Sequence, residues 1–244
     1  MQLPPPPVPN PTRHALFLDF DGTLVGFSDD PEAVHVPAGL VATLDRLARV
    51  FGGALAIVSG REIASLDRLL TPLSLPAAGV HGLQMRRDGQ IESNAAEAAR
   101  LAAARTSIAT AIGPGDPIRV EDKGGAIVLH YRGVPEAADR ACAVAEAAAA
   151  TDGGLVAVPG HAIVEVRPRA ITKAGAILRF MERPPFAGRH PIFVGDDVTD
   201  EDGFRAAIEA GGHAVKVGPG KTAASYRLAN VAAVRAWLRN CAGI

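Results

Sequence analysis

Several features that define other classes of protein are scarce in this sequence. Only two cysteines, Cys142 and Cys241, occur among 244 residues, and each lies in an alanine-rich stretch typical of a helix. A disulfide framework or a thiolate metal site needs more cysteines, so we expect two inert thiols in a reducing compartment. Lysine and arginine form no long cluster and the formal net charge is -1, so nucleic acid is not an expected partner.

Long apolar runs are also missing. The apolar stretches are interrupted well before the ~18 residues that a membrane helix needs, so no membrane partner is expected. The first residues, Met1 to Pro11, contain six prolines and lack the basic start and apolar run of a signal peptide. We therefore expect a flexible lead-in and a cytoplasmic protein.

The composition that is present is typical of a folded globular protein, with 48% apolar and 21% charged residues. The length allows one large domain, or a medium domain with a smaller companion. Short apolar runs at 15–20, 54–58 and 191–194 are predicted to be buried strands, and 36–50 and 173–183 have the apolar spacing of helices. This alternation predicts an α/β fold with a doubly wound parallel sheet.

The pattern changes after Leu83. Residues 85–92 have a hairpin signature around Asp88-Gly89, and they are followed by two alanine-rich helices and four strand candidates in adjacent pairs. This order predicts an antiparallel sheet covered by two helices. We expect residues 84–166 to form an inserted α+β domain, a cap, within a core of residues 1–83 and 167–244. The helices are expected at 95–112 and 135–150, and the strands at 118–122, 125–131, 155–158 and 162–166.

The first group of residues that can carry chemistry is Asp19-Phe-Asp21-Gly-Thr-Leu24, directly after a buried strand. Open α/β sheets bind their ligands at the carboxyl ends of parallel strands. Two acids spaced by one residue could take different roles there: one attacks phosphorus or holds a metal, and the other transfers a proton. The alternative is a turn with solvated acids, because Asp-Gly is a common turn pair.

The second group is Gly195-Asp-Asp-Val-Thr-Asp200, again after a buried strand. Asp196, Asp197 and Asp200 would repel one another unless a cation neutralised them. Oxygen ligands at a strand end favour Mg²⁺, which also binds substrate phosphate. The alternative is a solvated loop in which Thr199 and Asp200 only cap the next helix.

Two further positions could serve a phosphate group. Ser59-Gly60-Arg61 offers a hydroxyl and backbone N–H groups between a strand and a helix, and Ser59 to Glu62 also matches a capping box. A plain helix cap is the alternative. Lys173 lies near the start of the helix that follows the insert, where an ammonium could neutralise phosphate and Asp19, although a single lysine is ordinarily a surface residue.

Taken in order, these groups resemble the four motifs of the HAD (haloacid dehalogenase) superfamily of aspartate-nucleophile phosphotransferases, over nearly the whole chain. The resemblance implies Asp19 as nucleophile and Asp21 as general acid and base, with Lys173 as the third catalytic residue. It also implies Mg²⁺ held by Asp19, the backbone carbonyl of Asp21 and Asp196. Asp197 and Asp200 would support the ion, and Ser59, Gly60 and Arg61 would bind phosphate.

Further stretches narrow the resemblance to the trehalose-6-phosphate phosphatase family. They are Ser59-Gly-Arg61, Gly79-Val-His-Gly82, Val120-Glu-Asp-Lys-Gly-Gly125, Leu129-His-Tyr-Arg132, Glu165-Val-Arg-Pro168 and the run from Gly195 to Phe204. One departure is Ala174, where the family usually has glycine after the lysine; alanine should still allow a helix to start. His81 is interpreted as structural, because no second histidine or cysteine lies at metal spacing.

The insert is expected to recognise the substrate, a small-molecule sugar phosphate. The mixture of charged and imidazole side chains suits a hydroxyl-rich disaccharide, although the same residues could simply face water on a half-solvated sheet. The implied reaction is hydrolysis of trehalose 6-phosphate through an aspartyl-phosphate. The alternatives are a phosphatase of the same superfamily acting on sucrose phosphate or mannosylglycerate phosphate, or a non-catalytic module that binds sugar phosphate. The residues concerned are Glu121, Lys123, His130, Arg132 and Glu165.

Overall fold

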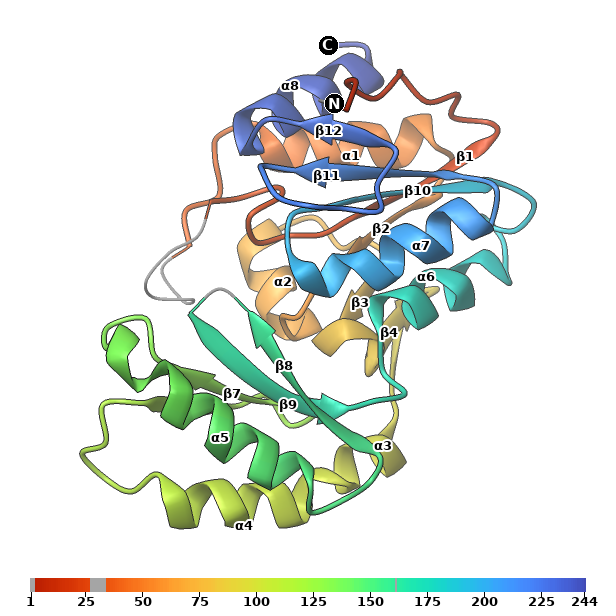
Figure 1. Cartoon of the computed structure of the whole chain (residues 1–244). Helices are drawn as coiled ribbons and strands as arrows, with labels where there is room; N and C mark the ends of the chain where they lie inside the picture. Colours follow the sequence, from red (N-terminus) through yellow and green to blue (C-terminus); the bar gives the residue numbers. More distant parts are fainter. Residues whose placement is uncertain (1–2, 27–33, 161) are drawn as a thin grey trace. The chain divides into compact units, whose positions relative to one another are not determined.

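The structure, a computed structural model, describes residues 3–26, 34–160 and 162–244. The chain divides into two compact units, Met1–Ile91 with Thr172–Ile244, and Glu92–Ile171 (Figure 1). Both junctions lie later in the chain than the expected boundaries after residues 83 and 166. The first difference arises because the hairpin that begins at Gln84 continues the sheet of the first unit, and the second because the last strand of the second unit extends to Pro168.

The first unit is built on an eight-stranded sheet with the order β12-β11-β10-β1-β2-β3-β4-β5. All neighbouring pairs from β12 to β3 are parallel, and β4 runs antiparallel to β3. This arrangement confirms the α/β class, and it places β1 between β2 and β10 at the centre of the sheet. The strands are β1 (His14–Leu18), β2 (Leu55–Val58), β3 (Ala77–Gly79), β4 (Gln84–Arg87), β5 (Gln90–Ser93), β10 (His190–Gly195), β11 (His213–Val217) and β12 (Tyr226–Leu228).

The predicted hairpin is confirmed between β4 and β5. Asp88 and Gly89 have φ angles of 52° and 75°. Positive φ at both central residues is what a two-residue type I′ turn requires. Glycine at position 89 therefore serves the turn itself.

Helices cover both faces of the sheet, as a doubly wound fold requires. Alternate residues of β1 point to opposite sides: Leu16 and Leu18 pack with α1, α2 and α8, whereas Ala15 and Phe17 pack with α6 and α7. The central strand is therefore buried on both faces, which explains why its sequence reads as a continuous apolar run. The helices are α1 (Leu40–Val50), α2 (Ile63–Leu70), α6 (Lys173–Met181), α7 (Glu201–Glu209) and α8 (Val231–Ala242).

The proline-rich segment before β1 packs against the sheet edge, so the expected flexible lead-in is wrong for residues 3–11. The carbonyl of Pro4 accepts a hydrogen bond from the Arg227 N–H of β12 at 3.0 Å. The carbonyl of Pro7 accepts one from Trp237 Nε1 of α8 at 3.2 Å. Pro6 and Pro9 are buried three residues apart, which is the repeat of a polyproline II helix. Carbonyl oxygens are the only hydrogen-bonding groups that prolines offer, and they meet donors of the edge strand and the last helix.

The second unit has a four-stranded antiparallel sheet in the order β6-β7-β9-β8. Apolar residues of one face of this sheet form a core with α4 and α5, which confirms the predicted antiparallel sheet with two helices. The strands are β6 (Arg119–Asp122), β7 (Ile127–His130), β8 (Leu155–Gly160) and β9 (Ile163–Pro168), and the helices are α3 (Ala95–Ala99), α4 (Leu101–Ala111) and α5 (Ala138–Ala149).

Both cysteines are free thiols on helices, as expected. Burial raises the pKa of Cys241 to about 12, so its thiol stays protonated. Among the residues that the structure describes, no helix is long and apolar enough to cross a membrane.

Candidate active site

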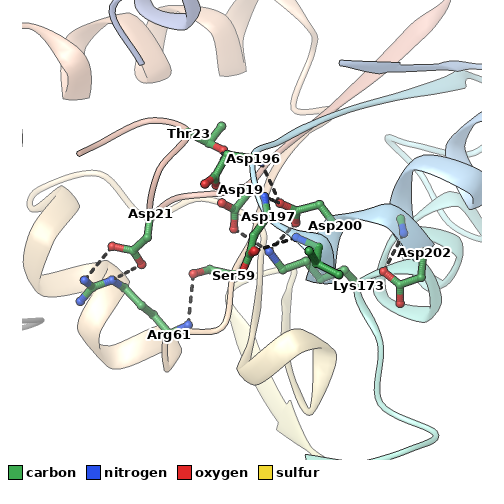
Figure 2. Close-up of polar contacts among 12 residues, drawn as sticks. Asp19, Asp21, Thr23, Ser59, Arg61, Lys173, Asp196, Asp197, Asp200 and Asp202 are labelled. Atoms are coloured by element: carbon green, nitrogen blue, oxygen red, sulfur yellow. Dashed lines mark hydrogen bonds and ion pairs between the residues drawn. The ribbon is translucent and has the colours of Figure 1, made fainter. Parts of the chain in front are cut away.

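The four segments predicted to carry catalytic, phosphate-binding or metal-binding residues meet at the carboxyl ends of the central parallel strands (Figure 2). Asp19 follows β1, Ser59 follows β2 and Asp196 follows β10, and these strands are parallel neighbours. Their carboxyl ends therefore present the three side chains to one place. Lys173 reaches the same place from the first residue of α6.

Lys173 links two carboxylates at the centre of the site. Its Nζ donates to Asp19 Oδ1 at 2.7 Å and to Asp200 Oδ1 at 2.5 Å. Lys173 and Asp19 are each 4% exposed, and Asp200 is fully buried. Burial alone would lower the pKa of Lys173, but the charges of Asp19 and Asp200 outweigh it and raise that pKa above its ordinary value. Lys173 is therefore a permanent ammonium next to Asp19.

The start of α6 explains how Lys173 is held. Thr172 is the N-cap, and its hydroxyl accepts a hydrogen bond from the Gly175 N–H at 3.0 Å. Ala174 lies in the first turn, so the expectation that alanine allows the helix to start here is confirmed.

Asp200 holds the acidic loop through hydrogen bonds to its backbone. Its Oδ2 accepts hydrogen bonds from the backbone N–H groups of Asp196 and Asp197, each at 2.9 Å. A Cβ at Gly195 would lie 2.4 Å from Asp200 Cγ, so the loop needs glycine there. The side chain of Asp200 makes no cap bond to α7, but its bond to the Asp197 N–H is part of a capping box at the 3₁₀ turn that precedes α7, so the capping alternative holds for that turn only. Because both of its oxygens are engaged, Asp200 suits a supporting role better than direct metal binding.

Asp196 lies against the loop that follows β1. Its Oδ1 accepts a hydrogen bond from Thr23 Oγ1 at 3.2 Å. A Cβ at Gly22 would lie 2.2 Å from Asp196 Oδ2, and Gly22 also has a φ of 75°. Glycine at position 22 therefore allows both the turn and the approach of the carboxylate.

The acidic side chains fit a hard divalent cation. Asp19, Asp196 and Asp200 each offer an oxygen within 4.8 Å of the others, the one such group in the described part of the chain. Burial and the neighbouring carboxylates raise the pKa of Asp196 to about 7, although Lys173 and Lys216 oppose the shift. Burial also raises the pKa of Asp19 well above its usual range, against the opposing charge of Lys173. A cation would offset this repulsion, and oxygen ligands suit Mg²⁺.

Asp21 is paired with Arg61 to one side of this cluster (Figure 2). Arg61 Nε donates to Asp21 Oδ2 at 2.6 Å, and Nη2 donates to Oδ1 at 2.8 Å. A bidentate pair of this kind fixes the orientation of the carboxylate. In this conformation the guanidinium of Arg61 is engaged with Asp21, so its expected phosphate contact stays a prediction.

Ser59 and Gly60 lie on the exit of β2 toward α2. Ser59 Oγ accepts a hydrogen bond from the Arg61 N–H at 3.1 Å. The predicted capping box is wrong, because α2 begins only at Ile63 and its N-cap, Glu62, makes no side-chain cap bond. A Cβ at Gly60 would lie 2.9 Å from Nε2 of the buried His81. The ring of His81 therefore fills the space beside Gly60, and its purely structural role stays a prediction.

Three of the five residues expected to bind substrate share one face of the four-stranded sheet. The register pairs Glu121 with Val128 and Val128 with Glu165, and His130 lies two residues further along the same strand face. The opposite face carries the apolar residues that pack with α4 and α5. Lys123 follows β6 directly and Arg132 follows β7.

Polar side chains are paired on this face. His130 Nε2 lies 2.7 Å from Glu121 Oε2, and this hydrogen bond is the main cause of the lowered pKa of Glu121. Glu165 is only 4% exposed, and its Oε2 lies 3.9 Å from Arg167 Nε. The alternative of a side chain directed into solvent therefore does not hold for Glu165.

Comparison with known proteins agrees with this geometry. A family model described as trehalose-phosphatase matches residues 17–232. The chain belongs to the trehalose-phosphatase family. Over 93% of its length it is 39% identical to the trehalose-6-phosphate phosphatase of Escherichia coli K12, and the match covers 85% of that protein.

Solved structures of other proteins share this fold. The C-terminal domain of Candida albicans trehalose-6-phosphate phosphatase matches with a TM-score of 0.86 and 24% identity, over 99% of this chain and 98% of that one. A Bacteroides thetaiotaomicron phosphatase of the HAD superfamily matches with a TM-score of 0.63 and 17% identity, over 98% of each chain. At these identities the likeness establishes the fold alone.

Two residues of this candidate site were not predicted from the sequence. Thr23 lies inside the first motif, but nothing in the motif itself shows that its hydroxyl contacts Asp196. Lys216 is the only charged residue in the strand Ala214-Val-Lys-Val217 and is buried. Buried lysine is rare enough that a lysine inside an apolar strand could have signalled a special role.

Proposed function

We propose that this chain hydrolyses trehalose 6-phosphate to trehalose and inorganic phosphate, using Asp19 as nucleophile. Family membership supports the phosphatase activity, and one observation carries the mechanism. Asp19 is buried with one oxygen held by the Lys173 ammonium, while its other oxygen accepts no hydrogen bond from the described residues. A carboxylate fixed in this way keeps a free oxygen for attack.

The reaction then has two steps. The free oxygen of Asp19 attacks phosphorus, the bond from phosphorus to the sugar oxygen breaks, and Asp21 gives a proton to that oxygen. This releases the sugar and leaves a phosphoryl group on Asp19. Asp21 next takes a proton from water, whose oxygen attacks phosphorus and frees both phosphate and Asp19. Lys173 offsets the negative charge throughout.

We also propose that Asp19, Asp196 and the backbone carbonyl of Asp21 hold Mg²⁺, supported by Asp197 and Asp200. When bound, the ion supplies electrostatic stabilisation for charge on the transferring group. Ser59 Oγ and the N–H groups near Gly60 would bind the phosphate oxygens. Proton transfer requires Asp21 to leave its bidentate pair, so Arg61 would gain its role toward phosphate only after that exchange.

Sugar recognition is proposed for the polar face of the four-stranded sheet, through Glu121, Lys123, His130, Arg132 and Glu165. Charged side chains can hydrogen-bond several hydroxyl groups of a disaccharide. The phosphate-binding residues cannot choose among sugar phosphates, so sucrose phosphate and mannosylglycerate phosphate belong in the same assay.

The decisive experiment is phosphate release from a panel of sugar phosphates by the purified protein with Mg²⁺. We expect trehalose 6-phosphate to have the highest kcat/KM. Asp19→Asn should lower turnover by about 10⁴-fold or more while the fold is retained, because the amide cannot attack phosphorus. Asp21→Asn should lose about 10²–10⁴-fold through lost proton transfer.

Asp202→Asn is a matched control, since this side chain belongs to α7 and accepts a hydrogen bond from the neighbouring Gly203 N–H. Turnover near the wild-type rate in Asp19→Asn would exclude the aspartyl-phosphate mechanism. Binding of sugar phosphate without any phosphate release by the wild-type protein would favour the non-catalytic module instead.

A further inference from the structure

A second buried lysine lies beside the acidic loop. Lys216 of β11 is opposite Gly195 of β10 in the parallel register and is 6% exposed. Its Nζ donates to the backbone carbonyls of Asp196 and Val217, the latter at 2.9 Å. In the part of the chain that the structure describes, it forms no ion pair with a carboxylate. Lys216 is therefore a buried cation whose hydrogen-bond partners are backbone oxygens.

This environment is unlike that of Lys173, which bridges two carboxylates. A buried ammonium without a direct counter-ion is unfavourable, and an apolar side chain would fill a buried strand position without that desolvation cost. The adjacent acidic cluster offers a reason for the charged side chain of Lys216 at this buried position. Lys216 contacts the same residue, Asp196, whose carboxylate belongs to the candidate metal site.

Asp196 is held at three points. Its backbone N–H donates to Asp200 Oδ2 at 2.9 Å, its carbonyl accepts from Lys216, and its carboxylate accepts from Thr23 at 3.2 Å. The first two contacts fix both sides of the backbone from which the side chain projects. Without the second, the peptide after Asp196 could rotate and turn the carboxylate away from Asp19.

We propose that Lys216 is a positioning residue of the metal site, which holds the Asp196 carboxylate toward Asp19. This inference rests on the proposed binding of Mg²⁺ by Asp196. Lys216 acts through Asp196, so its removal should affect the affinity for the ion first. Contacts that orient metal ligands are commonly worth about 10–100-fold in metal affinity.

The test compares Lys216→Met and Lys216→Gln with the wild type and with Lys221→Met. Lys221 is exposed and lies outside the strand, so it controls for the loss of one lysine charge. Isothermal titration should show Mg²⁺ binding weakened ~10–100-fold in both Lys216 variants and unchanged in the control. At saturating Mg²⁺, we expect the KM for trehalose 6-phosphate to stay within about twofold of wild type, because the sugar contacts are intact.

Thermal unfolding separates positioning from a purely structural role. A structural lysine would change the melting temperature equally with Mg²⁺ and with chelator, whereas a positioning lysine reduces the increase that Mg²⁺ produces. Equal increases in wild type and variants, or wild-type Mg²⁺ affinity in Lys216→Gln, would overturn the inference. If Lys216→Met does not fold, the measurements on Lys216→Gln alone decide the test. Absence of Mg²⁺ binding by the wild type would instead remove the metal part of the proposed function, and this inference with it.

Discussion

Among single residues, Gly22 is constrained both by its backbone conformation and by the close approach of a carboxylate of the candidate metal site. It has a φ of 75°, and a Cβ there would lie 2.2 Å from Asp196 Oδ2. We expect Gly22→Ala to displace the Asp196 carboxylate and to lower Mg²⁺ affinity ~10–100-fold, with a matching loss of activity at limiting Mg²⁺. Phosphate release measured against Mg²⁺ concentration checks this.

Gly89→Ala is the matched control for backbone strain. Gly89 has the same φ of 75°, and no described atom lies within 4 Å of a Cβ built there. Both variants should lose about 1–2 kcal/mol of stability from the left-handed backbone. Only Gly22→Ala should lose Mg²⁺ activation, and an equal response of the two to Mg²⁺ would contradict the proposed contact.

Two acids of the loop, Asp196 and Asp197, should contribute differently to the affinity for the metal. We expect activity to require Mg²⁺ and to disappear with a chelator, and we expect Asp196→Ala to weaken the metal dependence more than Asp197→Ala. The reason is that Asp196 faces Asp19, whereas Asp197 accepts a hydrogen bond from Val198 at 2.7 Å as the cap of a short 3₁₀ turn. Full activity in excess chelator would exclude the metal site.

The raised pKa of Asp196 predicts a pH dependence of stability in the metal-free protein. The ordinary pKa is 3.8 and the folded value is raised to about 7, so between these values the folded state holds a proton that the unfolded state has released. The free energy of unfolding should therefore fall as pH rises through this window and level off above it. Asp19, whose pKa is also raised, acts in the same direction.

Melting temperatures in chelator, from about pH 4 to about pH 8, check this dependence. Asp196→Asn should flatten the decline, because the amide does not titrate. Saturating Mg²⁺ should flatten it as well, since the ion stabilises the charged carboxylate. The same slope in Asp196→Asn and wild type would show that another group is responsible.

At the scale of secondary-structure elements, the proposed sugar recognition depends on one face of the sheet of the second unit. One face packs with α4 and α5, and the other carries Glu121, His130 and Glu165, with Lys123 at the end of β6. We expect Lys123→Ala and Glu165→Ala to lower kcat/KM for trehalose 6-phosphate by roughly ten- to a hundredfold, since a charged hydrogen bond is worth about 1.5–3 kcal/mol. A small aryl phosphate, which has no distal sugar, should be hydrolysed almost as before.

The kinetics of each variant on both substrates decide this prediction. Glu146→Ala, an exposed position on α5, is the control for loss of a charge from the same unit. Equal losses on the two substrates would assign Lys123 and Glu165 to folding or to the phosphate site, and recognition by this face would then fail.

At the scale of the whole molecule, periodicity and motif position were enough to predict the α/β sheet, the hairpin and the antiparallel insert. Short apolar runs ending in acids indicated which strand ends carry Asp19 and Asp196, because parallel neighbours bring such ends together. Contacts made by backbone groups could not be predicted in this way. The hydrogen bond from the Arg227 N–H to the Pro4 carbonyl leaves no mark in the sequence pattern. Lys216 within an apolar strand signals a buried charge, but not its partner, the carbonyl of Asp196.

Ambiguous local sequence patterns account for the two wrong predictions, the flexible lead-in and the capping box at Ser59. The prolines before β1 indicated a mobile segment, yet the carbonyls of Pro4 and Pro7 accept hydrogen bonds from neighbouring elements, which the sequence pattern does not show. Ser59 to Glu62 matched a capping box with Ser59 as N-cap, but the helix starts three residues later than that pattern requires, with Glu62 itself as N-cap. Such patterns cannot show where a strand exit ends and a helix begins.

The central position of β1 has a consequence for how the chain is made. This strand precedes the other strands of its sheet in the chain, but one of its two partners, β10, follows only after the whole second unit. The bond between Lys173 and Asp19 likewise joins residues 154 positions apart. A nascent chain must therefore keep an apolar strand with an open edge until β10 has been synthesised. Contacts of such long range slow folding and expose the intermediate to aggregation, so we expect truncated amino-terminal fragments to depend on chaperones and to be inactive.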